Sequence, residues 1–139
     1  MELVLIRRKE IMEKQPDIII STADLAELEY QLERSKLPID AIRAIENELD
    51  RATIVACKDL PENVVAIGSQ VTFKILDSQK VFTKTLCLPH DSVKFEDSIS
   101  VFAPIGSALI GLSTGQCIKW QTQRGQQSVE IIKVESRKR

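Results

Sequence analysis

Aromatic residues and long apolar runs are both scarce in this chain of 139 residues. Aromatics make up only 4% of it, as four Phe, one Tyr and one Trp. Proteins that read single-stranded nucleic acid by base stacking need several exposed rings, so the composition argues against that class. No apolar run approaches the roughly 18 residues of a membrane span, and the short apolar stretch at the N-terminus precedes its basic residues, the reverse of a secretory signal. We therefore expect a cytoplasmic protein with no membrane partner.

Histidine and cysteine, the usual zinc ligands, are also scarce. His90 is the single histidine, and the three cysteines, Cys57, Cys87 and Cys117, include no close pair. Zinc sites are usually recognised in a sequence by closely spaced Cys and His ligands, and this chain has no such spacing. The sequence therefore predicts no metal site and no cofactor, and it favours reduced, mostly buried thiols.

The net charge of −1 hides an uneven distribution. Residues 21–52 hold eight acids and four bases, a net charge of −4, whereas residues 53–139 hold eight acids and eleven bases, a net charge of +3. No single element concentrates basic residues, which argues against sequence-specific or general nucleic-acid binding. The basic residues 137–139 are typical of a solvated, frayed tail.

Two amphipathic helices are predicted in the first third of the chain. Ser21 and Asp24 resemble a capping box, with Asp in place of the usual Glu. The first helix should end near Lys36, because the residue before Pro38 resists helical geometry. Each predicted helix carries one stripe of apolar residues at helical spacing. The stripe consists of Leu25, Leu28 and Leu32 on the first helix and of Ile42, Ile45, Leu49 and Ala52 on the second. A short link at residues 35–38 makes this an antiparallel hairpin, which is too short to be stable without further support.

The pattern becomes strand-like after residue 63. Strands are predicted at 64–67, 71–75, 81–88, 99–101, 118–121 and 129–134, with a bend at 68–69 and a short helix over 104–112 that closes near Gly115. The fold class is therefore α+β, a short antiparallel helical hairpin followed by a small antiparallel sheet with one short helix. We divide the chain into a flexible extension at 1–17, the hairpin at 18–56 and a globular domain at 57–139.

Two motifs that suggest chemistry have simpler structural interpretations. Residues 111–115 match the G-x-S-x-G pattern of hydrolases, but the order here is helix and then strand, the reverse of a nucleophile elbow. A helix end with glycines at positive φ is the better interpretation. His90 and Asp91 are neighbours in a polar loop, and we expect them to be exposed and not to face each other.

In three stretches, at residues 99–111, at residues 68–73, and at residues 37–38 together with 48–52, the chain resembles the Gre-factor (GreA/GreB) family, and above all its Rnk branch, which is named for regulation of nucleoside diphosphate kinase. The most specific stretch is Ile-Ser-Val-Phe-Ala-Pro-Ile-Gly-Ser-Ala-Leu-Ile-Gly at residues 99–111. The others are Gly-Ser-Gln-Val-Thr-Phe at 68–73, and Leu-Pro at 37–38 together with Glu-Leu-Asp-Arg-Ala at 48–52. The resemblance runs from about Pro16 to Val134, so it covers most of the chain.

This resemblance implies a coiled-coil hairpin and an FKBP-like domain that docks at the rim of the secondary channel of bacterial RNA polymerase. By position, it assigns docking to Phe102, Ala103, Pro104 and Ile105. Phe102 stands where Gre factors often have an acid, and it has an alternative interpretation as a core residue. The hairpin tip contains Lys36, Leu37, Pro38 and Asp40.

The tip also departs from the family pattern. Gre factors carry an acidic pair there that supports Mg²⁺-dependent cleavage of backtracked RNA, whereas this hairpin is short and has Asp40 alone. We therefore expect a monomeric regulator that is not an enzyme, binds polymerase and competes with Gre factors. Two alternatives stay open: a cleavage factor that uses Asp40 with an acid such as Glu33, and a prolyl isomerase. The residues do not indicate whether any effect on nucleoside diphosphate kinase is direct.

Overall fold

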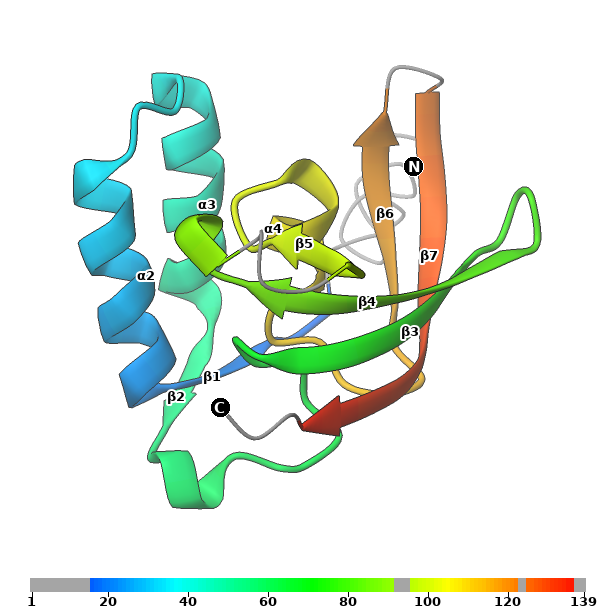
Figure 1. Cartoon of the computed structure of the whole chain (residues 1–139), viewed down its shortest axis with the longest axis horizontal. Helices are drawn as coiled ribbons and strands as arrows, with labels where there is room; N and C mark the ends of the chain where they lie inside the picture. Colours follow the sequence, from blue (N-terminus) through cyan, green and yellow to red (C-terminus); the bar gives the residue numbers. More distant parts are fainter. Residues whose placement is uncertain (1–15, 92–95, 123–124, 137–139) are drawn as a thin grey trace, which may run out of the picture.

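The computed structural model describes residues 16–91, 96–122 and 125–136 and shows a helical hairpin standing beside a five-stranded sheet (Figure 1). Most of the predicted extension at 1–17 and all of the basic tail at 137–139 therefore lie outside the described residues. The hairpin consists of α2 (Thr22–Arg34) and α3 (Ile39–Arg51), which run in opposite directions. Ser21 caps α2 as predicted, since its side chain accepts the N–H of Asp24 at 3.1 Å. The helix ends at Arg34, two residues before the predicted end.

The sheet is mixed, so the prediction of a purely antiparallel sheet was wrong. Its strands are β3 (Ser69–Ile75), β4 (Lys80–Cys87), β5 (Ser98–Ser100), β6 (Cys117–Thr122) and β7 (Gly125–Ser136), in the order β5-β4-β3-β7-β6. Strand β5 pairs with β4 in parallel, while the other neighbours are antiparallel. An alternating pattern of apolar residues reveals which side chains face the core, but it does not reveal the direction of the strand.

A second, two-stranded sheet lies at the base of the hairpin. It pairs β1 (Ile19–Ser21) with β2 (Thr53–Val55) in parallel, so the chain enters and leaves the hairpin side by side (Figure 1). By contrast, the strand predicted at 64–67 does not form. Val64 makes only an isolated bridge to Ser113, and Val65 bonds through its backbone to Gly111 and Leu112. This segment is a buried connection, preceded by the short helix η1 (Cys57–Asp59).

One hydrophobic core joins the hairpin to the sheet. It contains Leu28 and Leu32 of α2, Ile45 and Leu49 of α3, and strand residues such as Val71. Leu28 is only 1% exposed. The predicted apolar stripes therefore face this core, and the hairpin has the support that its length requires. The domain boundary at 56/57 stays a prediction.

Glycine explains the G-x-S-x-G motif, as predicted. Gly111 and Gly115 have φ angles of 83° and 89°, and a Cβ at Gly111 would lie 2.8 Å from the Cβ of Ile18. Helix α4 (Pro104–Leu109) ends before this turn, one turn earlier than predicted. The motif is thus a helix end rather than a catalytic elbow.

The prediction that His90 and Asp91 do not face each other was wrong. The short helix η2 (Pro89–Asp91) turns the two side chains together, and the His90 Nε2 lies 3.6 Å from the Asp91 Oδ2. The His90 side chain is 60% exposed, so this contact lies at the surface. No helix among the described residues is long and apolar enough to cross a membrane.

The cysteines differ in exposure, which corrects the expectation that most are buried. Cys57 and Cys117 are exposed, and only Cys87 is buried. Burial raises the pKa of the Cys87 thiol, and the nearby charge of Asp91 raises it further. Burial and the charge of Glu130 also raise the pKa of the Cys117 thiol, in spite of its exposure.

Thiol alkylation should therefore be selective. At neutral pH we expect iodoacetamide to modify Cys57 first and Cys117 more slowly, because a raised pKa leaves less of the reactive thiolate. Cys87 should react only after unfolding. Mass spectrometry of peptides over time measures the order, and rapid labelling of Cys87 in the native protein would contradict the burial described.

Candidate protein-docking surface

The family resemblance assigned docking to residues 102–105, here called the corner loop, which lead from the end of β5 into the first turn of α4. The turn is tight, because the backbone N–H of Phe102 donates to the Ser100 Oγ at 3.1 Å and that of Ala103 donates to the Ser100 carbonyl at 3.0 Å. Pro104 then occupies the first turn of α4, where its missing N–H costs nothing. Both ends of the corner loop are thus fixed by backbone geometry.

Gly106 allows α4 to pack closely against β5. A Cβ at this position would lie 1.9 Å from the carbonyl oxygen of Ser100, which no real pair of atoms tolerates. Only glycine allows the first turn of α4 to approach the strand so closely. The corner loop is therefore a rigid feature and needs little ordering when it binds a partner.

The predicted docking residues are partly accessible. Pro104 is exposed, whereas Phe102, Ala103 and Ile105 are half-buried. Phe102 and Ile105 pack against the hydrophobic core with one side. The two interpretations of Phe102, as a surface anchor and as a core residue, therefore both describe part of its side chain.

Phe102 separates two grooves between the hairpin and the globular part. The first, here called the tip groove, has a volume of about 560 Å³. The second groove, of about 340 Å³, runs between α3 and α4 and is lined mainly by small and apolar side chains such as Ala44 and Ala108. The tip groove is lined by Gln31, Arg34, Ser35, Lys36, Leu37, Pro89, Ser100, Phe102 and Ala103.

The structure thus brings together some predicted site residues and leaves others apart. Lys36 and Leu37 of the hairpin tip meet Phe102 and Ala103 across the tip groove, although 65 residues of sequence lie between Leu37 and Ala103. Pro38 and Asp40 are exposed at the tip and do not line this groove. Pro104 lines the second groove, and Ile105 lines neither.

The acids of the hairpin lie on a different surface. Glu29, Glu33, Glu46 and Asp50 line a groove between the two helices, together with Arg43. Asp40 is not part of this groove. Among residues 16–91, 96–122 and 125–136, no group of three or more His, Cys, Asp or Glu side chains is arranged to hold a metal ion.

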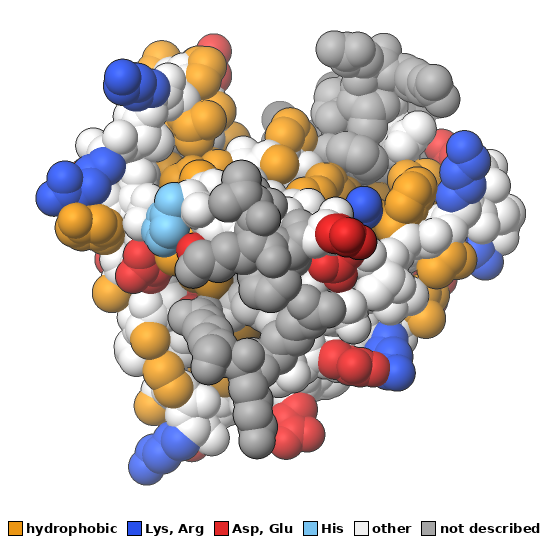
Figure 2. All heavy atoms as spheres, in the orientation of Figure 1, with side chains coloured by type: hydrophobic (Ala, Val, Ile, Leu, Met, Phe, Trp, Pro, Cys, Tyr) orange, Lys and Arg blue, Asp and Glu red, His pale blue; other side chains and the backbone are white. Residues whose placement is uncertain are grey.

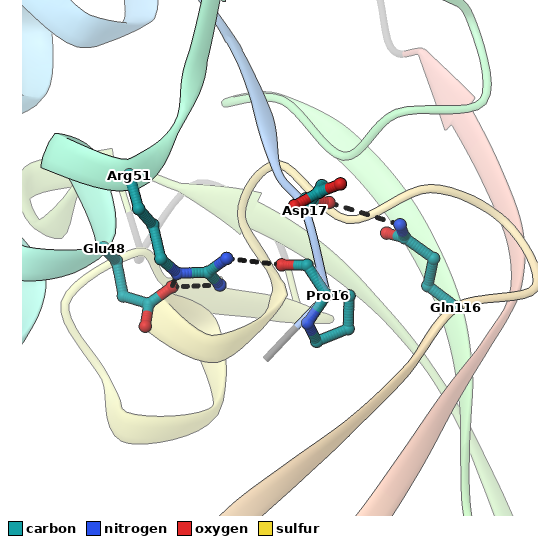
Figure 3. Close-up of polar contacts among 5 residues, drawn as sticks. All are labelled: Pro16, Asp17, Glu48, Arg51 and Gln116. Atoms are coloured by element: carbon teal, nitrogen blue, oxygen red, sulfur yellow. Dashed lines mark hydrogen bonds and ion pairs between the residues drawn. The ribbon is translucent and has the colours of Figure 1, made fainter. Parts of the chain in front are cut away.

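Two polar contacts that the sequence did not reveal fix the base of the hairpin. The Asp24 carboxylate, 7% exposed, accepts the backbone N–H of Ile67 at 3.0 Å. The Arg51 guanidinium donates to the Pro16 carbonyl at 2.5 Å and to the Glu48 carboxylate at 2.8 Å (Figure 3). The contacts to Ile67 and to Pro16 each join a hairpin helix to a segment outside the hairpin, so together they hold its direction, whereas the contact to Glu48 lies within α3.

The segment that precedes β1 is also tied to the sheet side of the molecule. The Gln116 amide donates to the Asp17 carbonyl at 3.2 Å (Figure 3).

The pairing of Glu48 with Arg51 could have been inferred from their i, i+3 spacing. The partners of Asp24, Arg51 and Gln116 outside the hairpin could not, because they are 35 to 99 residues away in sequence.

Comparison with known proteins decides the family. The family described as "Transcription elongation factor, GreA/GreB, C-term" matches residues 60–136, more than half of the chain. This chain belongs to the GreA/GreB family. The regulator of nucleoside diphosphate kinase from Escherichia coli is 35% identical over 126 residues, which is 87% of this chain and 90% of that protein.

Two further relatives span nearly the whole molecule. The transcription elongation factor GreA of Bacillus anthracis is 32% identical over 136 residues, 96% of this chain and 85% of that protein. A GreA/GreB transcription elongation factor structure from Nitrosomonas europaea superposes with a TM-score of 0.70 at 37% identity, covering 87% of this chain and 99% of the other. The chain is thus a GreA/GreB-family protein that resembles both the kinase regulator and the elongation factors, as its sequence had indicated.

Removal of the Asp24 carboxylate should weaken the attachment of the hairpin. We expect Asp24→Ala to lower the free energy of unfolding by about 1–3 kcal/mol, because the buried N–H of Ile67 loses its acceptor. Denaturant unfolding measures this loss. Asp40→Ala, which removes an exposed acid from the first turn of α3, should cost less than about 1 kcal/mol, and equal effects of the two variants would contradict the anchoring role.

Gly106→Ala should distort the corner loop. The added methyl group would overlap the Ser100 carbonyl, so we expect a loss of about 1–3 kcal/mol or more in thermal or denaturant unfolding. Ser107→Ala on the same helix removes only the hydroxyl bond to the Pro104 carbonyl, and its effect should be smaller. A fully stable Gly106→Ala protein would show that α4 can move away from β5.

Proposed function

We propose that this protein binds bacterial RNA polymerase at the rim of its secondary channel, competes there with Gre factors and does not stimulate transcript cleavage. The observation that carries the proposal is the corner loop, which presents an exposed Pro104 and a half-exposed Phe102 on a backbone fixed by Ser100 and Gly106. Rigid apolar anchors of this kind dominate the binding energy of many protein interfaces.

Family membership supports polymerase as the partner. Elongation factors such as the GreA of Bacillus anthracis align over nearly all of this chain, including the corner loop. The departure of Phe102 from the acid that Gre factors often carry changes one contact from ionic to apolar. We infer that the docking position is shared, while the chemistry of that contact is this protein's own.

The hairpin tip supports the absence of cleavage. Two carboxylates must converge to help hold a catalytic Mg²⁺ at the end of a hairpin. Residues 35–40 supply only Asp40, and Glu33 lines the groove between the helices, which Asp40 does not line. Occupation of the channel without cleavage is the behaviour that such a tip permits.

A prolyl isomerase is less well supported. An FKBP-like topology stays a prediction for the globular part, and isomerase activity would need a pocket lined by several aromatic rings. Among the residues whose side chains the structure describes, Phe102 is the one aromatic residue in the lining of the two grooves beside the corner loop.

The first experiment is binding to purified core RNA polymerase, followed by fluorescence, with GreA as competitor. We expect saturable binding that GreA displaces, and no shortening of the transcript when the protein is added with Mg²⁺ to a backtracked complex. Binding that GreA leaves intact would overturn the shared site. Cleavage of the transcript would instead identify an active Gre-type factor.

A surface variant tests the corner loop itself. We expect Pro104→Lys to weaken polymerase binding about tenfold, a loss of about 1.4 kcal/mol, because a charge replaces an apolar contact at the anchor. Val81→Lys places the same charge on an exposed apolar residue of β4 and serves as the matched control. Equal binding by both variants would show that the corner loop is not part of the interface.

A further inference from the structure

We infer that the tip groove receives an acidic segment of the protein partner, with an apolar side chain against Phe102 and a carboxylate held by Arg34 and Lys36. This inference rests on the proposed function, because the partner is taken to be polymerase. It adds the end of α2 to the docking surface and assigns a charge to the partner segment.

The lining of the tip groove combines two kinds of chemistry. Leu37, Pro89, Phe102 and Ala103 provide apolar surface, and Arg34 and Lys36 provide two positive charges. None of the described residues that line the groove is an acid. Apolar surface framed by charges of one sign is complementary to a segment that carries an apolar residue next to charges of the opposite sign.

This local charge is opposite to that of the hairpin as a whole. Residues 21–52 have a net charge of −4, and four of their acids line the groove between the helices instead. In the described part of the chain, no carboxylate forms an ion pair with Arg34 or Lys36. The two bases are therefore available to a partner's acid.

Arg34 is also held in position before any partner arrives. Its guanidinium carbon lies 4.4 Å from the centre of the Tyr30 ring, a cation–π contact between residues four apart on α2. A guanidinium stacked on a ring keeps its N–H groups free to bind a carboxylate in the plane of the fork. Figure 2 shows basic side chains gathered on the outer edge of the hairpin, next to exposed apolar surface.

The geometry matches a bound segment rather than a small ion. The groove of about 560 Å³ extends from the last turn of α2 across the tip to the corner loop. Its two charged residues come from one wall and Phe102 comes from the other. A segment that lies between these walls contacts both the hairpin and the globular part. Its binding therefore depends on how these two parts are positioned relative to each other.

Charge reversal and covalent capture test this inference. We expect the double variant Arg34→Glu, Lys36→Glu to weaken polymerase binding by about tenfold at 50 mM salt, with a smaller loss near 0.5 M salt, where charges are screened. Arg43→Glu, an exposed base that lines the groove between the helices, is the matched control and should change binding less than about twofold.

A carbodiimide, which joins an amine directly to a carboxylate, should link Lys36 to an Asp or Glu of polymerase. Mass spectrometry identifies the linked peptides. Lys36→Arg keeps the positive charge and should keep binding while losing this link.

The outcomes separate the two proposals. Wild-type protein that fails to bind polymerase overturns the proposed function and this inference with it. If the wild-type protein, the double variant and the control bind polymerase with equal affinity, this inference alone is overturned. The corner loop then remains the docking site. Binding of RNA by the free protein, lost in the double variant, would show that the bases serve a nucleic acid and would also overturn it.

Discussion

The burial of the hairpin base in the same core as the sheet is the constraint on which the other features depend. Helices of 13 residues are marginal in water, so α2 and α3 persist because Leu28 and Leu49 pack against sheet residues. The parallel pairing of β1 with β2 brings both ends of the hairpin to one place, and the Ile19 N–H donates to the Gly111 carbonyl at 3.0 Å. The hairpin therefore projects from the globular part in a fixed direction.

That fixed direction creates two surfaces of different chemistry. On one, acidic side chains line the groove between the helices, where Arg43 is the base in the lining. On the other, the hairpin tip faces the corner loop across a groove with apolar and basic walls. In the corner loop, glycine at position 106 allows α4 to lie close to the Ser100 carbonyl, where a side chain would not fit. Both walls of the tip groove are thus set before binding.

Membership of the GreA/GreB family explains the arrangement of elements in this chain. The identity of 35% to a kinase regulator and of 32% to an elongation factor places the chain between two kinds of named protein. Fold alone does not choose between them. Residues 35–40 of the hairpin tip hold one acid, Asp40, and residues 102–105 of the corner loop hold one aromatic ring, Phe102.

Local chemistry along the sequence by itself determined the helices, most of the strands and the family. Ser21 capped α2 because a cap involves residues three apart, and Gly111 and Gly115 marked a helix end because their positive φ angles are a local requirement. The tertiary structure alone decided the parallel direction of β5, the buried connection at 64–67 and the contact between Asp24 and Ile67. It also decided which side of Phe102 is buried, and that Arg34 and Lys36 face it across a groove. These features join residues far apart in the chain, and no pattern within a few residues of either partner records where the other will lie.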